Sequence, residues 1–137
     1  MSQFMTYKEI MKIYTSYYAR IRQLPENVIP ISIAISTPKF YSGLVYKKLA
    51  PTYDILNHWK AEHNIEDYIK QFEKILQALS VEEVIKDLFV MGKGNDVALI
   101  CYEKPTDFCH RHLVADWLTE QGYPCEEFIK ENKINDR

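Results

Sequence analysis

Long apolar runs alternate along this chain with segments whose apolar residues recur every three or four positions. Residues 10–16 and 28–35 are rich in β-branched and aromatic side chains, which favours β-strands. Residues 97–102 form an unbroken apolar run, the pattern of a strand covered on both faces. Residues 125–129 are suited to one further strand. The pattern therefore predicts four strands, the last of them near the C-terminus.

Apolar periodicity and capping residues predict helices between these strands. Thr52 is suited to cap a first helix, and a second helix follows Asn64. Ser80 opens a capping-box sequence, Ser-Val-Glu-Glu, ahead of a third helix that runs toward Gly92. A fourth helix follows a polar loop and ends at Gly122. The expected buried positions of these helices are Ile55, Leu56, Trp59, Tyr68, Ile69, Phe72, Ile75, Leu76, Leu79, Val84, Ile85, Leu88, Phe89, Leu113, Val114, Trp117 and Leu118.

Strands that alternate with helices are typical of a parallel sheet with helices on its two faces. We therefore predict a single α/β domain over residues 1–137. Residues 1–10 are either a short N-terminal extension or contain, from Tyr7 to Ile10, the beginning of the first strand. Ligands of such sheets bind beyond the carboxyl ends of the strands, so a functional site is expected there.

Composition is that of an ordinary globular domain, with 47% hydrophobic and 26% charged residues. Lysine and arginine together number 17 against 19 acidic residues, which gives a net charge of −2. Proteins that hold nucleic acid by its phosphates are usually basic, so we do not expect nucleic acid as a partner. No run of about 18 apolar residues occurs, so we expect no membrane span.

The N-terminus and the cysteines indicate a cytoplasmic protein. The first residues lack the basic start and apolar core of a secretory signal. Cys101, Cys109 and Cys125 make an odd number, which favours reduced thiols over a disulfide framework. These cysteines, His110 and His112 are also potential zinc ligands, but their spacing fits no Cys-x-x-Cys or His-x-x-x-His pattern, so we expect no metal. No phosphate-binding glycine motif occurs, and we expect no cofactor.

Polar residues gather where three of the predicted strands end. They are Thr15, Ser16 and Tyr17 after the first strand, Thr37 and Lys39 after the second, and Glu103, Thr106, Cys109, His110 and Arg111 after the third. Because these strand ends meet at one edge of a parallel sheet, the hydroxyls, the lysine and the helix start form a candidate cradle for an anion. An aromatic ring in the same cradle, such as that of Tyr17, is suited to stacking on a ligand ring.

Cys109 lies in the first turn of the last helix if Thr106 or Asp107 is its cap. Unpaired amides, the helix dipole and neighbouring cations lower the pKa of a thiol at such a position. Arg111 offers a planar fork suited to a phosphate or carboxylate. The arrangement suits either a reactive thiolate or a thiol that contacts a bound anion. It remains open that Cys109 only packs in the core and that Arg111 pairs with an acid such as Asp107 or Glu103.

Residues 97–118 resemble the domain-of-unknown-function 488 family. Members of that family carry a hydrophobic strand with a Cys-x-Glu end, here Cys101 and Glu103, and then Cys-His-Arg at a helix start, here residues 109–111. The resemblance extends over nearly the whole chain, through residues 12–17, 30–33, 38 and 46–53. It implies a Rossmann-like three-layer α/β sandwich with a mainly parallel central sheet, and a pocket lined by the motif. The resemblance does not supply an activity for the protein.

The chain departs from the family pattern at residues 34–38, where many members have an Asp-Val-Arg-like strand end. If that arginine holds the ligand in other members, Lys39 has to substitute for it here.

Three classes of function follow from these residues. The first is a protein that binds a small phosphorylated or nucleotide-derived ligand at residues 106–111, as a sensor or sponge of a nucleotide signal. The second is an enzyme acting on a nucleotide or sugar phosphate, with Cys109 as nucleophile or with Glu103 and His110 as acid and base. The third is a structural protein in which His110 and Arg111 tie the loop to the sheet. The surplus of aromatic residues also leaves a homodimer open.

Overall fold

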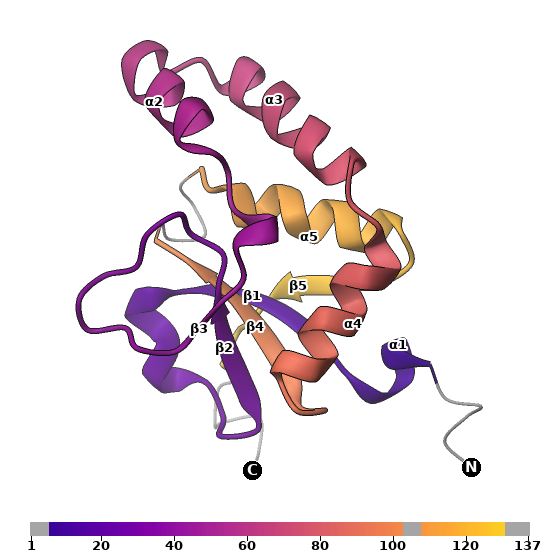
Figure 1. The fold of residues 1–137 in the computed structure, drawn as a ribbon. Coiled ribbons are helices and arrows are strands. Elements are labelled where there is room, and N and C mark those ends of the chain that lie inside the picture. Colours follow the sequence, from indigo (N-terminus) through magenta and orange to yellow (C-terminus); the bar gives the residue numbers. More distant parts are fainter. Residues whose placement is uncertain (1–5, 103–107, 131–137) are drawn as a thin grey trace.

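The computed structural model describes residues 6–102 and 108–130. At its centre lies a sheet of five parallel strands in the order β3-β2-β4-β1-β5 (Figure 1). The strands are β1 (Ile13–Tyr17), β2 (Val28–Ser32), β3 (Leu44–Val45), β4 (Asp96–Cys101) and β5 (Cys125–Glu127). The predicted α/β fold with a parallel sheet is therefore confirmed, and the two-residue strand β3 is an addition to the predicted set.

Helices connect the strands, and three of them begin at the predicted capping residues. The helices are α1 (Tyr7–Ile10), η2 (Tyr18–Gln23), η3 (Lys47–Leu49), α2 (Tyr53–Glu62), α3 (Ile65–Gln77), α4 (Val81–Met91) and α5 (His110–Glu120). The side chains of Thr52, Asn64 and Ser80 each accept a hydrogen bond from the amide three positions further on. Each bond satisfies an amide that has no partner within the helix. Gly122, with a φ of 98°, follows α5 as predicted.

The bounds of three predicted strands need correction. Tyr7–Ile10 form helix α1, so the alternative that the first strand begins there is wrong. The Thr6 amide donates to Glu9 Oε1 at 2.7 Å, a local bond that favours a helical turn over a strand. Strand β2 ends at Ser32 and not at residue 35, because Ser32 Oγ accepts a bond from the amide two positions on and the chain leaves the sheet. Strand β5 ends at Glu127.

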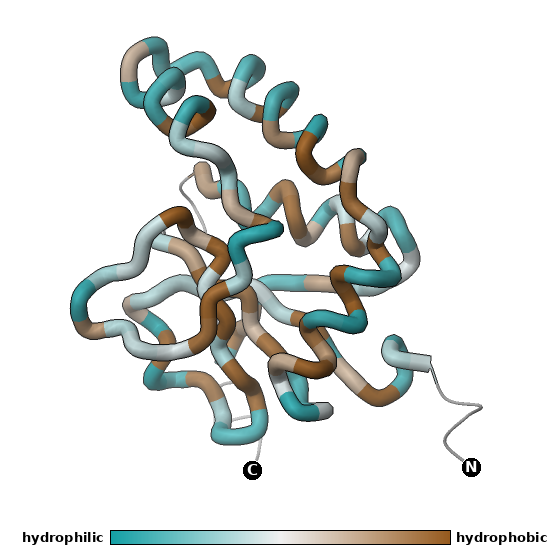
Figure 2. The backbone as a smooth tube through the Cα atoms, viewed as in Figure 1, coloured by the Kyte–Doolittle hydropathy of each residue, from teal (hydrophilic) through white to brown (hydrophobic). Residues whose placement is uncertain are grey.

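Alternate residues of the central strand β4 face two different apolar layers. Val97 and Leu99 belong to the larger core cluster, together with residues of α3, α4 and α5. Ala98 and Ile100 belong to a smaller cluster on the opposite face, where Tyr18 of η2 packs. Figure 2 shows hydrophobic residues along the central strands and hydrophilic ones along the outer turns of α2 and α3. Among the described residues, no helix is both long enough and apolar enough to cross a membrane.

The strand order creates a crevice between the carboxyl ends of β2 and β4. The chain leaves β2 toward β3 at one edge of the sheet, and leaves β4 through α5 toward β5 at the other edge. Neighbouring strands whose connections diverge in this way leave a gap above the sheet, which is where ligands of open parallel sheets bind. The topology therefore places the candidate site beside the end of β4 and the start of α5.

Candidate functional site

A pocket of about 130 Å³ occupies this crevice, and we call it the crevice pocket. Its walls come from the segment after β2, from the region of α2 and α3, from the end of β4 and from the start of α5. The lining residues are Ala34, Ile35, Ser36, Pro51, Leu56, Trp59, Tyr68, Cys101, Tyr102, Phe108, Cys109 and His110. The pocket thus combines mostly apolar and aromatic walls with a small group of sulfur and imidazole side chains, a composition typical of small-molecule sites.

Three rings from three different parts of the chain form one side of the pocket, which we call the aromatic wall: Trp59 of α2, Tyr68 of α3 and Phe108. The Phe108 ring centroid lies 5.4 Å from that of Trp59 and 4.9 Å from that of Tyr68. Trp59 and Tyr68 lie 5.9 Å apart in an edge-to-face arrangement. Such mutual contacts hold the rings in place, so the wall is a preformed apolar surface.

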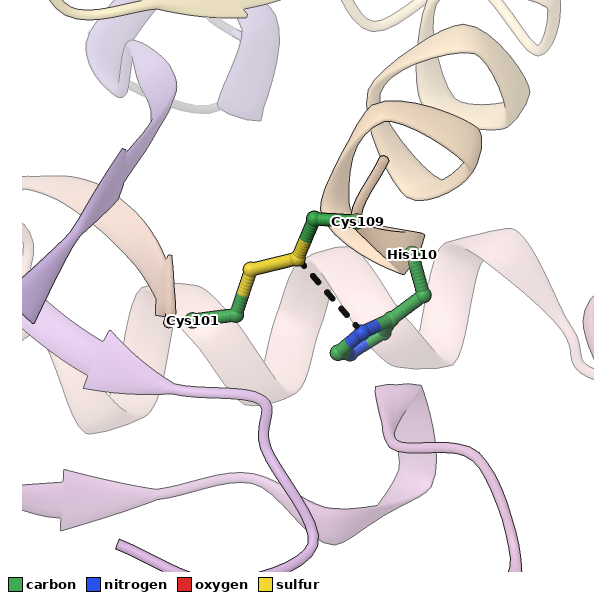
Figure 3. A group of neighbouring side chains, drawn as sticks. All are labelled: Cys101, Cys109 and His110. Carbon is green, nitrogen blue, oxygen red and sulfur yellow. Dashed lines mark hydrogen bonds between the residues drawn. A yellow bond between two sulfur atoms is a disulfide. The ribbon is translucent and has the colours of Figure 1, made fainter. Parts of the chain in front are cut away.

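Cys101 and Cys109 meet at the floor of the pocket and are joined by a disulfide (Figure 3). Cys101 is the last residue of β4, and Cys109 directly precedes α5. The expectation of reduced thiols is therefore wrong for two of the three cysteines, because the chain returns to the end of its own strand within eight positions. Cys125 is free and buried. Burial is also the main cause that raises the pKa of its thiol to about 12.

Cys109 is the residue that precedes the first turn of α5, and its side chain makes no capping hydrogen bond. The helix begins at His110, so the prediction that Cys109 lies within the first turn is corrected by one position. Thr106, which was expected to cap the helix or to bind the ligand, lies outside the described residues, as do Asp107 and Glu103. The amides of the first turn still point toward the pocket end of the helix, where the helix dipole favours negative charge.

His110 is buried beside the disulfide and is held by a backbone group just beyond the end of β2. Its Nε2 lies 2.7 Å from the carbonyl oxygen of Ile33. Its Nδ1 lies 3.9 Å from Cys109 Sγ, as Figure 3 shows. The Phe72 ring packs edge-on against the imidazole at 5.3 Å. Burial, followed by the nearby Arg111 cation, lowers the pKa of His110 to about 4. The imidazole is therefore neutral at physiological pH.

Arg111 is fully buried and is committed to contacts within the protein. Its Nε and Nη2 atoms donate to the two carboxylate oxygens of Glu127, each at 3.1 Å. Its Nη1 donates to Cys101 Sγ at 3.0 Å, and the guanidinium lies 5.4 Å from the centroid of the Tyr17 ring. Thr15 Oγ1 donates to the same Glu127 carboxylate at 2.7 Å. The arginine thus links the end of β4 to β1 and β5.

The remaining candidate residues lie around the pocket without lining it. Thr15, Ser16 and Tyr17 are buried at the end of β1, on the far side of β4 from the crevice. Ser16 Oγ is buried and has no hydrogen-bond partner among the described residues. Thr37 is partly buried and Lys39 exposed, in the segment after β2. The described structure therefore brings together Cys109, His110 and Arg111 and does not bring the whole predicted cradle into one pocket.

Three groups at the candidate site could not be identified from the sequence. Glu127, which the sequence did not single out as a site residue, is the ion-pair partner of Arg111. Cys101, expected inside a buried strand, shares the pocket floor with Cys109. The Ile33 carbonyl, a backbone group, is the orienting partner of His110. Only the family pattern, which pairs a Cys-x-Glu strand end with Cys-His-Arg, carried a signal for any of these groups.

A comparison with known families identifies the family to which this chain belongs. A family model for DUF488-N3a, described as the active DUF488-N3 subclade, matches residues 7–122, which is well over half of the chain and includes the whole of the crevice pocket. No curated protein and no solved structure gives a significant match. The resemblance seen in the sequence is therefore confirmed, and this chain belongs to the DUF488-N3a family.

Proposed function

We propose that this protein binds a small nucleotide-derived ligand in the crevice pocket, with a pyrimidine-sized ring against the aromatic wall. The observation that carries the proposal is the juxtaposition of Trp59, Tyr68 and Phe108 with Cys109 and His110 in one pocket at the point where the strand order diverges. Flat rings favour stacking on such a surface because apolar area is buried and quadrupoles are matched.

The size of the pocket favours a single ring over a large cofactor. Its volume of about 130 Å³ is close to that of an engineered cavity of about 150 Å³ that binds benzene. A fused dinucleotide cofactor needs several times this space. The ligand is therefore expected to place one ring inside the pocket and its remaining groups at the mouth.

Two features at the pocket edge suit an anionic group attached to that ring. The first turn of α5 presents amides at the positive end of the helix dipole, beside Cys109. The ammonium group of the exposed Lys47 donates a hydrogen bond to the carbonyl oxygen of Ile35, a residue that lines the pocket. Arg111 is not needed for this role, since Glu127 already neutralises its charge. The proposal thus replaces the Arg111 fork by Lys47 and the helix start as the anion-binding groups.

The experiment is ligand identification followed by calorimetry. Compounds released from protein purified under native conditions are identified by mass spectrometry, and pyrimidine nucleosides and their monophosphates are then titrated into ligand-free protein. Trp59→Ala is expected to weaken binding of both compound classes about 5- to 150-fold, the effect of losing about 1–3 kcal/mol of stacking. Tyr53→Ala is the matched control, because Tyr53 lies exposed on the same helix and outside the pocket.

A second pair of variants tests the anion-binding groups. Lys47→Ala is expected to weaken the binding of the monophosphates and to leave the binding of the nucleosides unchanged. Lys48→Ala is the control, because this neighbour turns toward Asp87 at 3.5 Å and not toward the pocket. If no ring compound is released, none binds on titration, and Trp59→Ala behaves like Tyr53→Ala, the proposed function is wrong.

A thiol-dependent enzyme acting on the same ligand class is a second candidate, favoured by the environment of His110. In the reduced protein the Cys109 thiol lies beside Nδ1, while the Ile33 carbonyl orients the ring, so His110 has the orienting partner that a general base requires. A cytoplasmic location, as expected from the sequence, would keep the cysteines reduced. The description of the subclade as active fits this candidate. Cys109→Ser separates the two functions, since binding survives the change and nucleophilic turnover does not.

A further inference from the structure

Cys101, Cys109 and His110 direct three metal-ligating atoms into one small volume. The two sulfur atoms and an imidazole nitrogen all lie within 4.8 Å of one another, and all three residues are buried. We propose that the reduced protein binds a soft divalent cation, with Zn²⁺ as the best match, through Cys101 Sγ, Cys109 Sγ and His110 Nδ1. The proposal concerns the floor of the crevice pocket and does not depend on any ring ligand.

One of the ligand-atom distances is already close to that of a tetrahedral site, whereas the two sulfur atoms, bonded to one another in the disulfide, have to separate after reduction. Zinc bonds of about 2.3 Å to sulfur and about 2.0–2.1 Å to nitrogen place ligand atoms about 3.5–3.8 Å apart. Cys109 Sγ and His110 Nδ1 are already 3.9 Å apart. The Cα atoms of Cys101 and Cys109 are separated by 7.4 Å, slightly more than the range of about 4.4–6.8 Å usual for disulfides. A cation between the two sulfurs spans such a separation easily.

The tautomer of His110 suits metal binding through Nδ1. The Ile33 carbonyl can only accept a hydrogen bond, so Nε2, at 2.7 Å, carries the proton. Nδ1 is then left with a free lone pair on the side of the sulfur atoms (Figure 3). Metal-binding histidines commonly donate their other N–H to a backbone carbonyl or carboxylate, which fixes the ring and raises its basicity. The packing of Phe72 against the imidazole holds the same orientation.

The charge around the cysteines favours the thiolate form that a metal requires. Arg111 Nη1 donates to Cys101 Sγ at 3.0 Å, and a cation so placed stabilises a thiolate. The charge of Arg111 is itself balanced by Glu127 at 3.1 Å. Two thiolates and one divalent cation then add no net charge to this buried region. A site of two sulfurs and one imidazole favours zinc over harder cations such as Mg²⁺.

The spacing of the ligands in the sequence does not match a known metal-binding motif, because the ligands come from two different elements. Cys101 ends β4, whereas Cys109 and His110 begin α5, and the two meet only because α5 starts above the end of its preceding strand. A site with three protein ligands keeps a fourth position for water or substrate, the arrangement of catalytic and not of structural zinc. In this protein that position faces the crevice pocket, which all three residues line.

The disulfide and the metal exclude one another, so the site responds to redox state. A reducing dithiol transfers two electrons and two protons to the Cys101–Cys109 bond, which yields two thiols while the dithiol becomes a disulfide. Binding of Zn²⁺ then forms two metal–sulfur bonds and releases the two thiol protons to solvent. A disulfide oxidant reverses both steps: it takes two electrons from the two metal-bound thiolates and two protons from solvent, becomes two thiols, and leaves the Cys101–Cys109 bond and a free Zn²⁺.

Cobalt titration tests the proposal on the full chain. Co²⁺ is added under anaerobic conditions to protein treated with a phosphine reductant and, separately, to oxidised protein. The reduced protein is expected to take up one Co²⁺ per chain, with the thiolate charge-transfer bands and intense visible bands of a tetrahedral cobalt site, and Zn²⁺ is expected to abolish these bands. The oxidised protein is expected to show neither band. Absence of both bands from the reduced protein overturns the proposal.

Variants identify the ligands. The double variant Cys101→Ser, Cys109→Ser is expected to lose the bands, and His110→Gln is expected to weaken binding by at least about tenfold. Cys125→Ser is the control and should bind Co²⁺ like the unaltered protein, because Cys125 lies at the opposite end of the strands from the pocket. Bands that survive in the double variant overturn the proposal.

A measurement without variants covers the case in which the double variant fails to fold. Iodoacetamide is applied to the reduced, unaltered protein with and without Zn²⁺, and modified cysteines are located by peptide mass spectrometry. Zn²⁺ is expected to slow modification of Cys101 and Cys109 at least about tenfold, because a coordinated thiolate is a weaker nucleophile. Equal rates with and without Zn²⁺ overturn the proposal.

Discussion

The imidazole of His110 reaches across the crevice from the first residue of α5 and bonds the carbonyl of Ile33, just beyond the end of β2, at 2.7 Å. The bond joins two segments that are 77 positions apart in the chain. It closes the floor of the crevice pocket, sets the imidazole tautomer and leaves Nδ1 beside Cys109. The contact therefore helps to fix the geometry of the pocket floor.

Removal of this contact is expected to destabilise the fold. His110→Leu leaves the buried Ile33 carbonyl without its partner, which typically costs about 1–3 kcal/mol. The free energy of unfolding, measured by urea denaturation, is expected to fall by this amount. His58→Leu is the control: His58 is half-exposed and forms a surface pair with Asp67, worth at most about 1 kcal/mol. Equal losses in the two variants would contradict the structural role of His110.

The same burial makes the stability of the oxidised protein depend on pH. The native pKa of His110, about 4, lies below the ordinary value of 6.5, so the unfolded chain binds the proton more tightly. The contribution of His110 is therefore complete above pH 6.5 and is lost as the pH falls toward 4, with a slope approaching about 1.4 kcal/mol per pH unit. Urea denaturation at several pH values measures this slope. His110→Gln should flatten the curve in this window, and an unchanged curve would contradict the assignment.

The pairing of Arg111 with Glu127 predicts that the carboxylate is structural. Glu127→Gln removes the charge of the carboxylate that accepts from two guanidinium nitrogens of the fully buried Arg111, at an expected cost of about 3 kcal/mol in the free energy of unfolding. Lys48→Ala, which removes a surface pair with Asp87, should cost less than about 1 kcal/mol. Thermal denaturation of both variants checks the difference. A Glu127→Gln protein as stable as Lys48→Ala would show that Arg111 has no need of this partner.

The three cysteines are expected to differ in reactivity after reduction. Burial raises the pKa of Cys125 to about 12, so its thiolate fraction at pH 8 is about one in ten thousand. Cys109 lines the crevice pocket and directly precedes α5, where the helix dipole and neighbouring cations favour a thiolate. Iodoacetamide applied to native, metal-free, reduced protein should therefore modify Cys109 well before Cys125. In urea-unfolded protein the two should react alike, and an equal rate in the native protein would contradict the placement of Cys125.

Features determined within a few residues of one another could be predicted from the sequence. The caps at Thr52, Asn64 and Ser80 depend on a bond to an amide three positions away, and the unbroken apolar run of β4 is a local pattern. Strand β3 could not be predicted, since two residues are too few to show a period. Its pairing with β2 depends on the tertiary structure.

The candidate site was predictable only in part, because its key partners are distant in the chain. The Cys-His-Arg triplet marked the right helix start, but nothing in the sequence showed that Arg111 pairs with Glu127, 16 positions away. The partner of His110 is a backbone carbonyl, which no residue pattern can mark. The N-cap of α5 is Cys109 and not the expected Thr106 or Asp107. The position of a cap depends on the path of the chain between strand and helix, which the local sequence does not determine.

The most direct test of the proposed function uses the two tryptophans of the chain. Trp59 belongs to the aromatic wall, whereas Trp117 is buried against the core on α5 and does not line the pocket. Their indole N–H signals are followed by nuclear magnetic resonance while pyrimidine nucleosides and monophosphates are added to the reduced, ligand-free protein. A saturable shift of the Trp59 signal with an unmoved Trp117 signal is the predicted result. Two signals that stay fixed across the whole panel would contradict ring binding in the crevice pocket.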